Sequence, residues 1–380
     1  MGKVITAHAP TIALFLPSLD GGGAERVFVQ LANEFVALGV RVHLLLAVAR
    51  GPYLNEVAGG VRIVDLAARD VLRSLPKLVR YLRRERPSVV LSALDHSNIV
   101  AILACAIART ETRCVISMRS VPSAVYREGG SSRNWVLPML MRRGYGLADR
   151  VIANSRAVAS DLIEKFRVPA EKLTVIYNPL DLESIEPLCR ETIENLWLSR
   201  NASPLILGVG RLDVLKDFPT LIRAFSIVRT KRECRLAILG EGPERRGLEE
   251  LVAKLGLQKD VDLPGFVGNP FAWMRRAEVV VCSSLTEGCP NALMQALACG
   301  TAVVSTECVG GCSEILEGGR WGRLVPVGDA QAMADSILAT MNGGERVDVG
   351  KRAADFAIEE IARTYLRQLI PDFGFPAVER

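Results

Sequence analysis

The sequence predicts an α/β protein made of two doubly wound domains, each a parallel β-sheet covered by helices. Three observations lead to this fold class. The chain has 380 residues, more than one hydrophobic core usually organises. Short apolar runs typical of buried strands alternate with helical patterns through both halves, and a glycine turn follows the first strand of each half. Because parallel sheets bind ligands at the carboxyl ends of their strands, we expect the active site in the cleft between the domains.

The first domain begins with a βαβ pattern. Residues 11–19 are a buried-strand run, the glycines at 21–23 form a turn, and a helical pattern then ends at Gly39, before a second strand at 40–48. Further strands are expected at residues 61–66, 89–94, 113–117 and 150–154. We place this N-terminal Rossmann-like domain at residues 1–185.

The second domain repeats the architecture after a break in the pattern. Residues 186–203 lack a clear period and contain Pro187, which favours a linker region. Strands are then expected at residues 205–209, 235–239, 261–263, 279–282, 302–305 and 323–325. We place the second Rossmann-like domain at 204–355 and a C-terminal helix at 356–380, with a return of that helix to the first domain left open.

The composition excludes several classes of protein. Hydrophobic residues make up 49% and charged residues 23%, as in ordinary globular chains, which excludes a largely disordered or fibrous protein. The longest apolar stretch, 99–108, is half the length of a spanning helix of about 20 residues. With no export signal recognised, we expect a cytoplasmic protein. The cysteines are scattered without a Cys-x-x-Cys pair, so we expect reduced thiols, no metal and no cofactor.

The first half of the chain carries most of the positive charge. Residues 1–185 hold 24 basic and 16 acidic residues, whereas the remainder holds 23 and 26. Aromatic residues are only 6% of the chain, and this composition argues against nucleic acid as a partner. Residues 73–86, from Arg73 to Arg86, form a basic amphipathic pattern around an apolar stripe. Two interpretations stay open for it: a solvated face over the core, or a docking surface for an anionic membrane.

Three segments contain the residues to which we assign chemistry. The glycines at 21–23 precede a helix, whose first N–H groups favour a phosphate or a carboxylate. Arg211 and Lys216 follow the glycine turn that ends at Gly210, and together they are suited to clamping a diphosphate. Glu287 lies between a strand and a helix start, where its carboxylate can accept hydrogen bonds from sugar hydroxyls. A plain turn, solvated cations and a helix cap are the alternatives for the three segments.

Taken together, these motifs resemble the retaining, nucleotide-sugar-dependent glycosyltransferases of family 4, which have the GT-B fold. The resemblance spans most of the chain and depends on the ordered set of motifs, since any one glycine loop is a weak signal. The segments that carry it are Gly21–Gly23 with Glu25, residues 208–216, 240–243, 264–268, 283–300 and 311–315.

The resemblance assigns roles to individual positions. It implies that Arg211 and Lys216 stabilise the departing diphosphate and that Glu287 contacts the transferred sugar. It places Val267 beside the base, glycines near the phosphates and backbone amides at the start of the helix after Glu287. The implied donor-binding positions are Gly22, Gly23, Gly210, Gly242, Val267, Gly288, Asn291, Ala292 and Gln295.

One position departs from the family pattern. Gln295 stands where the family has a second glutamate, eight residues after Glu287, that contacts the ribose hydroxyls. An amide oxygen still accepts a hydrogen bond, but the charge-assisted bond is lost, a difference of about 1 kcal/mol. We therefore expect weaker donor binding.

The acceptor side is less clear from the residues. Asp95, His96 and Arg119 each follow a predicted strand of the first domain, where active-site loops of α/β proteins lie. We take them as acceptor-side candidates, with a surface cap as the alternative for His96.

The implied function is transfer of a hexose or N-acetylhexosamine from a nucleoside-diphosphate sugar to a lipid-linked glycan or lipid, with retention at the anomeric carbon. Uridine is the expected nucleoside, and the expected location of the protein is the inner face of the cytoplasmic membrane. The alternatives are a degenerate homologue that binds a membrane surface or sugar nucleotides without turnover, and a nucleotide-sugar epimerase. A nicotinamide oxidoreductase lacks support because the dinucleotide fingerprint is missing.

Overall fold

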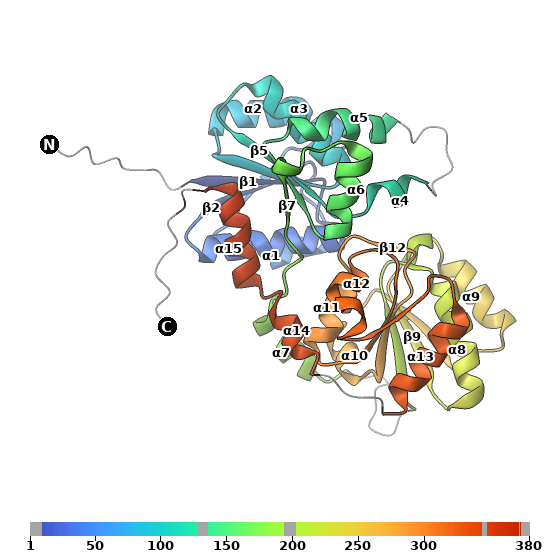
Figure 1. The fold of residues 1–380 in the computed structure, drawn as a ribbon. Coiled ribbons are helices and arrows are strands. Elements are labelled where there is room, and N and C mark those ends of the chain that lie inside the picture. The colour runs from blue at the N-terminus through green and yellow to red at the C-terminus, as the bar shows by residue number, and fades with distance from the viewer. Residues whose placement is uncertain (1–9, 128–135, 194–202, 344–347, 372, 374–380) are drawn as a thin grey trace. The chain divides into compact units, whose positions relative to one another are not determined.

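The chain folds into two compact units in a computed structural model that describes residues 10–127, 136–193, 203–343, 348–371 and 373 (Figure 1). One unit comprises the residues up to Pro179 together with those from Ile358 onward, and the other comprises Leu180–Ala357. Helix α7, Leu182–Arg190, occupies the start of the predicted linker, whose residues 194–202 lie outside the described ranges.

The first unit contains a seven-stranded parallel sheet. Its strand order is β3-β2-β1-β4-β5-β6-β7, and the chain reverses its direction of winding between β1 and β4, the position where doubly wound sheets bind ligands. The strands are β1 Thr11–Leu16, β2 Arg41–Leu46, β3 Arg62–Asp65, β4 Val89–Ala93, β5 Arg113–Met118, β6 Arg150–Ala153 and β7 Leu173–Val175.

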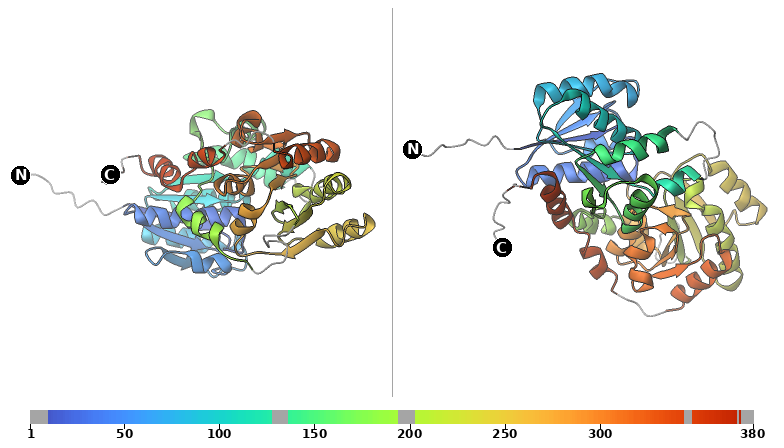
Figure 2. Two further views of the ribbon diagram at one scale, coloured as in Figure 1. Left: turned by 90° about the horizontal axis from the view of Figure 1, so that it is seen from below. Right: turned by 45° about the horizontal axis from the view of Figure 1, so that its top comes forward.

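Helices cover both faces of this sheet because its strands are apolar on both sides. Ala13 and Phe15 of β1 pack on one face with residues of α2, α3, α5 and α6, whereas Ile12 and Leu14 pack on the other with α1 and α15. Helices α1 and α15 lie side by side although most of the chain separates them in sequence (Figures 1 and 2). The helices are α1 Gly23–Ala37, α2 Leu75–Glu85, α3 Asp95–Ala108, α4 Pro122–Arg127, α5 Val136–Gly144, α6 Arg156–Phe166 and α15 Ile358–Leu369.

The second unit has a six-stranded parallel sheet of order β10-β9-β8-β11-β13-β15. Helices α8, α9 and α13 cover one face, while α10 and α11 contact β8 and β11. The strands are β8 Leu205–Val209, β9 Arg235–Leu239, β10 Val261–Gly265, β11 Val279–Cys282, β13 Val303–Thr306 and β15 Arg323–Val325. The further helices are α8 Phe218–Lys231, α9 Arg245–Lys254, α10 Phe271–Arg276, α11 Asn291–Ala298, α12 Cys312–Ile315, α13 Ala330–Met341 and α14 Gly350–Ala354.

The predicted α/β class with two parallel sheets is confirmed, and the structure adds small elements that the sequence did not predict. Besides α7 and β7, a two-stranded parallel pair joins β12, Thr286–Glu287, to β14, Val309–Gly310. Within the ranges described, no helix combines the length and the apolar character needed to cross a membrane.

Candidate functional site

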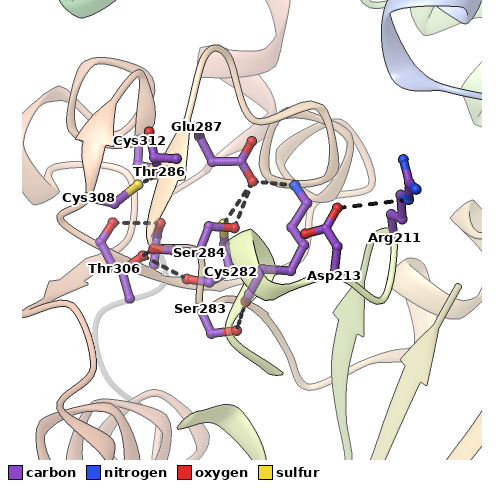
Figure 3. Close-up of polar contacts among 12 residues, drawn as sticks. Arg211, Asp213, Cys282, Ser283, Ser284, Thr286, Glu287, Thr306, Cys308 and Cys312 are labelled. Atoms are coloured by element: carbon purple, nitrogen blue, oxygen red, sulfur yellow. Dashed lines mark hydrogen bonds and ion pairs between the residues drawn. The ribbon is translucent and has the colours of Figure 1, made fainter. Parts of the chain in front are cut away.

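The centre of the candidate site is an ion pair between Lys216 and Glu287. The Lys216 Nζ and Glu287 Oε1 atoms are in direct contact, and the two side chains are 26% and 12% exposed. Ser284 donates a second hydrogen bond from its Oγ to the same carboxylate oxygen, at 2.7 Å (Figure 3). The pair is therefore fixed in place and still open to solvent on one side.

Two loops at the carboxyl edge of the second sheet position this pair. Lys216 ends a short 3-10 turn after β8, and Glu287 lies on β12 after β11. The loops are joined by two hydrogen bonds: Ser283 Oγ donates to the Lys216 carbonyl at 2.7 Å, and the Leu285 N–H donates to the Leu215 carbonyl at 2.8 Å.

Gly310 completes the support for Glu287. It pairs with Glu287 in the β12–β14 ladder and has a φ of 138°, in the region that favours glycine. A Cβ atom at this position would lie 1.5 Å from the Glu287 carbonyl oxygen. Only glycine therefore allows β14 to approach Glu287 so closely.

The ion pair holds Lys216 in its charged form. Burial alone would lower the pKa of the ammonium group, but the charge of Glu287, with Cys282 and Asp213 nearby, raises the pKa of Lys216 above its usual range. A permanent cation at this position suits the binding of a phosphate.

Arg211, the second predicted cation, has a different environment. Its side chain is 73% exposed, and its Nε atom lies 4.0 Å from Asp213 Oδ2. Figure 3 shows Arg211 beyond Asp213 and apart from Glu287. The structure thus brings Lys216 together with Glu287. The Arg211 guanidinium, five residues before Lys216, is exposed to solvent.

Gly210 and Gly242 lie in two loops that pack closely on one another. The Leu212 N–H donates to the Glu241 carbonyl at 2.9 Å, which ties the loop after β8 to the loop after β9. A Cβ on Gly242 would lie 2.2 Å from the Leu212 carbonyl oxygen, and one on Gly210 would lie 3.2 Å from the Lys216 side chain. Gly242 therefore leaves room for the Leu212 backbone, and Gly210 leaves room for the Lys216 side chain.

The remaining donor-side positions surround the start of α11. Gly288 is buried, whereas Asn291 and Ala292 form the half-buried first turn of α11, which has no side-chain cap on Pro290. Gln295 is half-buried one turn further along the same helix, and Val267 is half-buried just after β10. The first turn of α11 thus follows Glu287 closely in sequence, and its amides suit an anion.

The glycine turn of the first unit is held by its own glutamate. The N–H groups of Gly21 and Gly22 both donate to Glu25 Oε2, at 2.8 Å. The Glu25 carboxylate therefore already accepts the hydrogen bond of the Gly22 N–H, one of the two predicted phosphate contacts here. The other, Gly23, is the first residue of α1. An anion at this turn would have to displace the Glu25 carboxylate.

The three acceptor-side candidates have different environments. Asp95 is half-buried, accepts a hydrogen bond from the Tyr126 hydroxyl at 2.5 Å, and has a pKa raised chiefly by burial. His96 is exposed beside it. Leu94, just before them, has a φ of 73°, a strained backbone of the kind found at functional sites.

Arg119 is engaged within the first unit. Its guanidinium donates to Asn178 Oδ1 at 2.7 Å and to the Tyr365 hydroxyl at 3.3 Å, and it lies 5.2 Å from the Phe28 ring centre. These contacts join the end of β5 to α1 and α15. Arg119 therefore packs between α1 and α15, whereas Asp95 contacts Tyr126 of α4.

Sequence reasoning missed three residues of the second-unit site: Ser284, Gly310 and Cys282. Ser284 lies within the 283–300 motif, yet a serine there has no distinctive spacing. Cys282 Sγ is 3.5 Å from Ser284 Oγ and 4.0 Å from Glu287 Oε1. The consecutive Gly310 and Gly311 were the one available signal for a close backbone approach.

Comparison with known families and proteins matches both halves of the chain. The family described as "Glycosyltransferase Family 4" matches residues 21–184, and "Glycosyl transferases group 1" matches residues 203–342. A Campylobacter jejuni protein, N-acetylgalactosamine-N,N'-diacetylbacillosaminyl-diphospho-undecaprenol 4-alpha-N-acetylgalactosaminyltransferase, is 30% identical over 94% of this chain and 99% of its own length.

Solved structures share the fold. HepE of Anabaena, in a complex with UDP-glucose, has a TM-score of 0.78 at 21% identity and covers 95% of this chain and 99% of its own. Sucrose-phosphate synthase of Thermosynechococcus elongatus has a TM-score of 0.77 at 21% identity, covering 96% of this chain and 100% of its own.

Proposed function

Because the chain belongs to glycosyltransferase family 4 and has the GT-B fold, we propose that it transfers a hexose or N-acetylhexosamine from a UDP-sugar to a lipid-linked glycan or lipid. The name of the Campylobacter relative, which acts on a diphospho-undecaprenol substrate, supports the acceptor class. The UDP-glucose bound by HepE supports the donor class.

The observation that carries this proposal is the contact of Lys216 with Glu287 at the carboxyl edge of the second sheet. A diphosphate bound there would meet the ammonium of Lys216 and the first amides of α11, both suited to negative charge. The exposed Arg211 guanidinium has the freedom to close on the same group with two parallel hydrogen bonds.

In the proposed reaction the bond between the anomeric carbon and the β-phosphate oxygen breaks. The acceptor oxygen then forms a bond to the anomeric carbon on the face of the sugar that the diphosphate leaves. The departing phosphate takes the acceptor proton, so no protein nucleophile is needed. Lys216 and Arg211 stabilise the charge that develops on the leaving diphosphate. Glu287 is a positioning residue that accepts hydrogen bonds from the sugar hydroxyls.

A donor panel tests the proposal. The purified chain is incubated with UDP- and GDP-sugars and an undecaprenyl-diphosphate-linked acceptor, and released nucleotide and glycosylated lipid are measured. We expect acceptor-dependent UDP release and a lipid gaining one sugar. Glu287→Ala should lower kcat by about 10²–10³-fold, whereas the matched control Glu250→Ala, on the exposed face of α9, should keep it.

The competing classes give different results. A nucleotide-sugar epimerase would convert the donor without releasing UDP. A non-catalytic homologue would bind UDP or lipid and release nothing with any donor. Either result rejects transfer as the function.

We further propose that α2 and α3 dock the chain on an anionic lipid surface, the inner face of the cytoplasmic membrane. A groove of about 650 Å³ between them is lined by Leu75, Pro76, Val79 and Ile107 together with Arg80, Arg83 and Arg84. Leu103 and Ile107 of α3 are 45% and 47% exposed. Apolar side chains beside arginines match a phospholipid, which offers an acyl chain and a phosphate.

The arginines of this groove have distinct roles. Arg83 donates to the Ile107 carbonyl at 2.8 Å and so caps α3, and Arg84 lies 3.7 Å from Glu85. Arg80 has no ion pair with a carboxylate of the described ranges. In vesicle sedimentation, we expect binding to phosphatidylglycerol vesicles that falls with salt, and none to phosphatidylcholine. Arg80→Glu with Arg84→Glu should abolish binding, while Arg246→Glu on α9 should retain it. Equal binding by both variants would refute the α2–α3 surface.

A further inference from the structure

A carboxylate and a phenol from two helices meet at the carboxyl edge of the first sheet. Asp95 is the first residue of α3, shortly after β4, and its Oδ2 atom accepts a hydrogen bond from the Tyr126 hydroxyl of α4 at 2.5 Å. Strand β4 adjoins β1, and the winding of the sheet reverses between these two strands. Doubly wound sheets bind ligands at this position. The donor site proposed in the second unit does not use this pair.

The first turn of α3 is fixed to two strands. The buried Asn98 accepts a hydrogen bond from the Ser92 hydroxyl of β4 at 2.7 Å and donates one to the Ser117 carbonyl of β5 at 3.0 Å. Just before the helix, Leu94 has a φ of 73°, a backbone conformation that leucine rarely adopts. Such strain persists only where the surrounding structure holds it. Asp95 is therefore presented on a rigid base.

The chemistry of the pair favours a polyol over a phosphate. An ionised carboxylate only accepts hydrogen bonds, and it has capacity for more than the one that Tyr126 donates. Because Tyr126 is neutral, it does not cancel the negative charge of Asp95, and that charge would repel a phosphate. Asp95 is half-buried, so a ligand hydroxyl that reaches it competes with less water than on an open surface.

We propose that Asp95 binds the acceptor: its carboxylate accepts a hydrogen bond from a hydroxyl of a lipid-linked sugar, and Tyr126 holds the carboxylate in place. The bound hydroxyl is a neighbour of the attacking one, because the attacking hydroxyl gives its proton to the departing phosphate. Asp95 thus orients the sugar and takes no proton, and Tyr126 is a positioning residue. The inference rests on the proposed transferase function and deepens it, since it selects Asp95 over His96 and Arg119 and a sugar over a bare lipid.

Protonation of Asp95 should abolish this hydrogen bond. Burial raises the pKa of Asp95 above its ordinary value, against the opposing effects of Tyr126, His96 and Tyr145, the titratable side chains that act on it in the described part of the chain. As the pH falls, Asp95 therefore takes up a proton sooner than an exposed aspartate and stops accepting. Tyr126→Phe removes a contact that favours the ionised form, so it should raise the pKa of Asp95 further.

Steady-state kinetics on the full chain test the acceptor contact. The substrates are a UDP-sugar and an undecaprenyl-diphosphate-linked N-acetylhexosamine. Asp95→Asn should raise the KM for this acceptor about tenfold or more, the value of a lost charge-assisted hydrogen bond, and leave the KM for the UDP-sugar unchanged. Glu164→Gln removes an exposed carboxylate from α6 of the same unit and is the matched control, which should keep both KM values.

The pH profile of kcat/KM for the acceptor separates positioning from a general effect on folding. We expect an acidic limb that moves to higher pH by about one unit in Tyr126→Phe, the value of a hydrogen bond to a charged group, and that is absent in Asp95→Asn. Tyr81→Phe, which removes a buried phenol that contacts His43, should leave the limb in place. An acidic limb that is the same in all these proteins overturns the proposal.

An unchanged acceptor KM in Asp95→Asn, or an equal rise for donor and acceptor, also overturns it. Should Asp95→Asn not fold, Tyr126→Phe keeps the carboxylate, and the position of its acidic limb decides. Equilibrium binding of the same lipid-linked sugar without donor needs no turnover. If the chain transfers no sugar but Asp95→Asn binds this lipid more weakly than the unmodified chain, the proposed function fails and the Asp95 site stands. If the chain transfers sugar and both proteins bind the lipid equally, the assignment of Asp95 alone fails.

Discussion

Lys216 was predicted to act with Arg211, but its contacts are with Glu287. Both members of this ion pair were identified from the sequence, because a lysine after a glycine turn and a glutamate before a helix follow recognisable spacing. Their mutual contact depends on two loops 71 residues apart in the chain, and neither loop has a period that reveals its partner. Ser284 and Cys282 were missed for the same reason.

The charge of Lys216 should persist across the pH range of activity. Because Glu287 raises the pKa of Lys216 in the folded protein, the charged lysine stabilises the fold up to about pH 10, the ordinary lysine value, wherever the Glu287 carboxylate is ionised. That stabilisation is lost as the pH rises further and Lys216 loses its proton. Between pH 8 and about 10, we expect no fall in kcat/KM caused by deprotonation of Lys216. A basic limb in this range that disappears in Lys216→Arg would contradict the assignment.

Replacing Gln295 by glutamate should strengthen the binding of the UDP-sugar. Gln295→Glu restores the carboxylate of the family pattern, and a charge-assisted hydrogen bond to a ribose hydroxyl is worth about 1 kcal/mol more than a neutral one. The KM for the UDP-sugar should therefore fall about fivefold with kcat little changed. An unchanged or higher KM would show that Gln295 does not face the nucleotide.

Among the elements, most strands of the two large sheets were predicted, including the three-residue β15, whereas β7, β12 and β14 were not. Strands of five or six apolar residues are visible in the sequence, whereas β12 and β14 have two residues each and β7 has three. Helix α7 was read as linker because Pro187 lies inside it, although Asp181 caps its start by accepting from the Ser184 N–H at 3.0 Å. Such elements depend on packing against neighbours more than on their own pattern.

The β12–β14 pair gives a test at this scale. Gly310→Ala would place a Cβ 1.5 Å from the Glu287 carbonyl oxygen, so β14 must move away and release Glu287. We expect a loss of about a hundredfold in kcat and more than about 1 kcal/mol in the free energy of unfolding. Gly247→Ala, in α9 with open space around it, is the matched control and should keep both. Full activity of Gly310→Ala would contradict the role of this strand pair.

Helix α15 should stabilise the first unit through Arg119. Removing the guanidinium by Arg119→Ala leaves Asn178 and the Tyr365 hydroxyl without this donor and should cost about 1–3 kcal/mol in the free energy of unfolding. Urea unfolding followed by circular dichroism measures the change. If Arg119→Ala is as stable as the unmodified chain but fails to use the acceptor, Arg119 contacts substrate instead.

For the whole molecule, the fold class followed from the sequence because two parallel sheets need many buried strands joined by helices, and that alternation covers most of the chain. The boundaries were harder, since the chain enters the second unit at Leu180 and re-enters the first at Ile358. Both crossings lie beside regular elements, so composition does not mark them. The site chemistry was predictable only where a motif combined glycine with charge.

The central claim is that the second unit binds a nucleoside diphosphate through Lys216. Isothermal titration calorimetry of UDP against the full chain and Lys216→Ala tests it most directly, with Lys259→Ala as an exposed lysine control. We expect the unmodified chain and Lys259→Ala to bind UDP equally, and Lys216→Ala to bind it about tenfold or more weakly, the value of a lost charge-assisted hydrogen bond. Equal affinity for all three proteins, or no binding of UDP by any of them, would contradict the account.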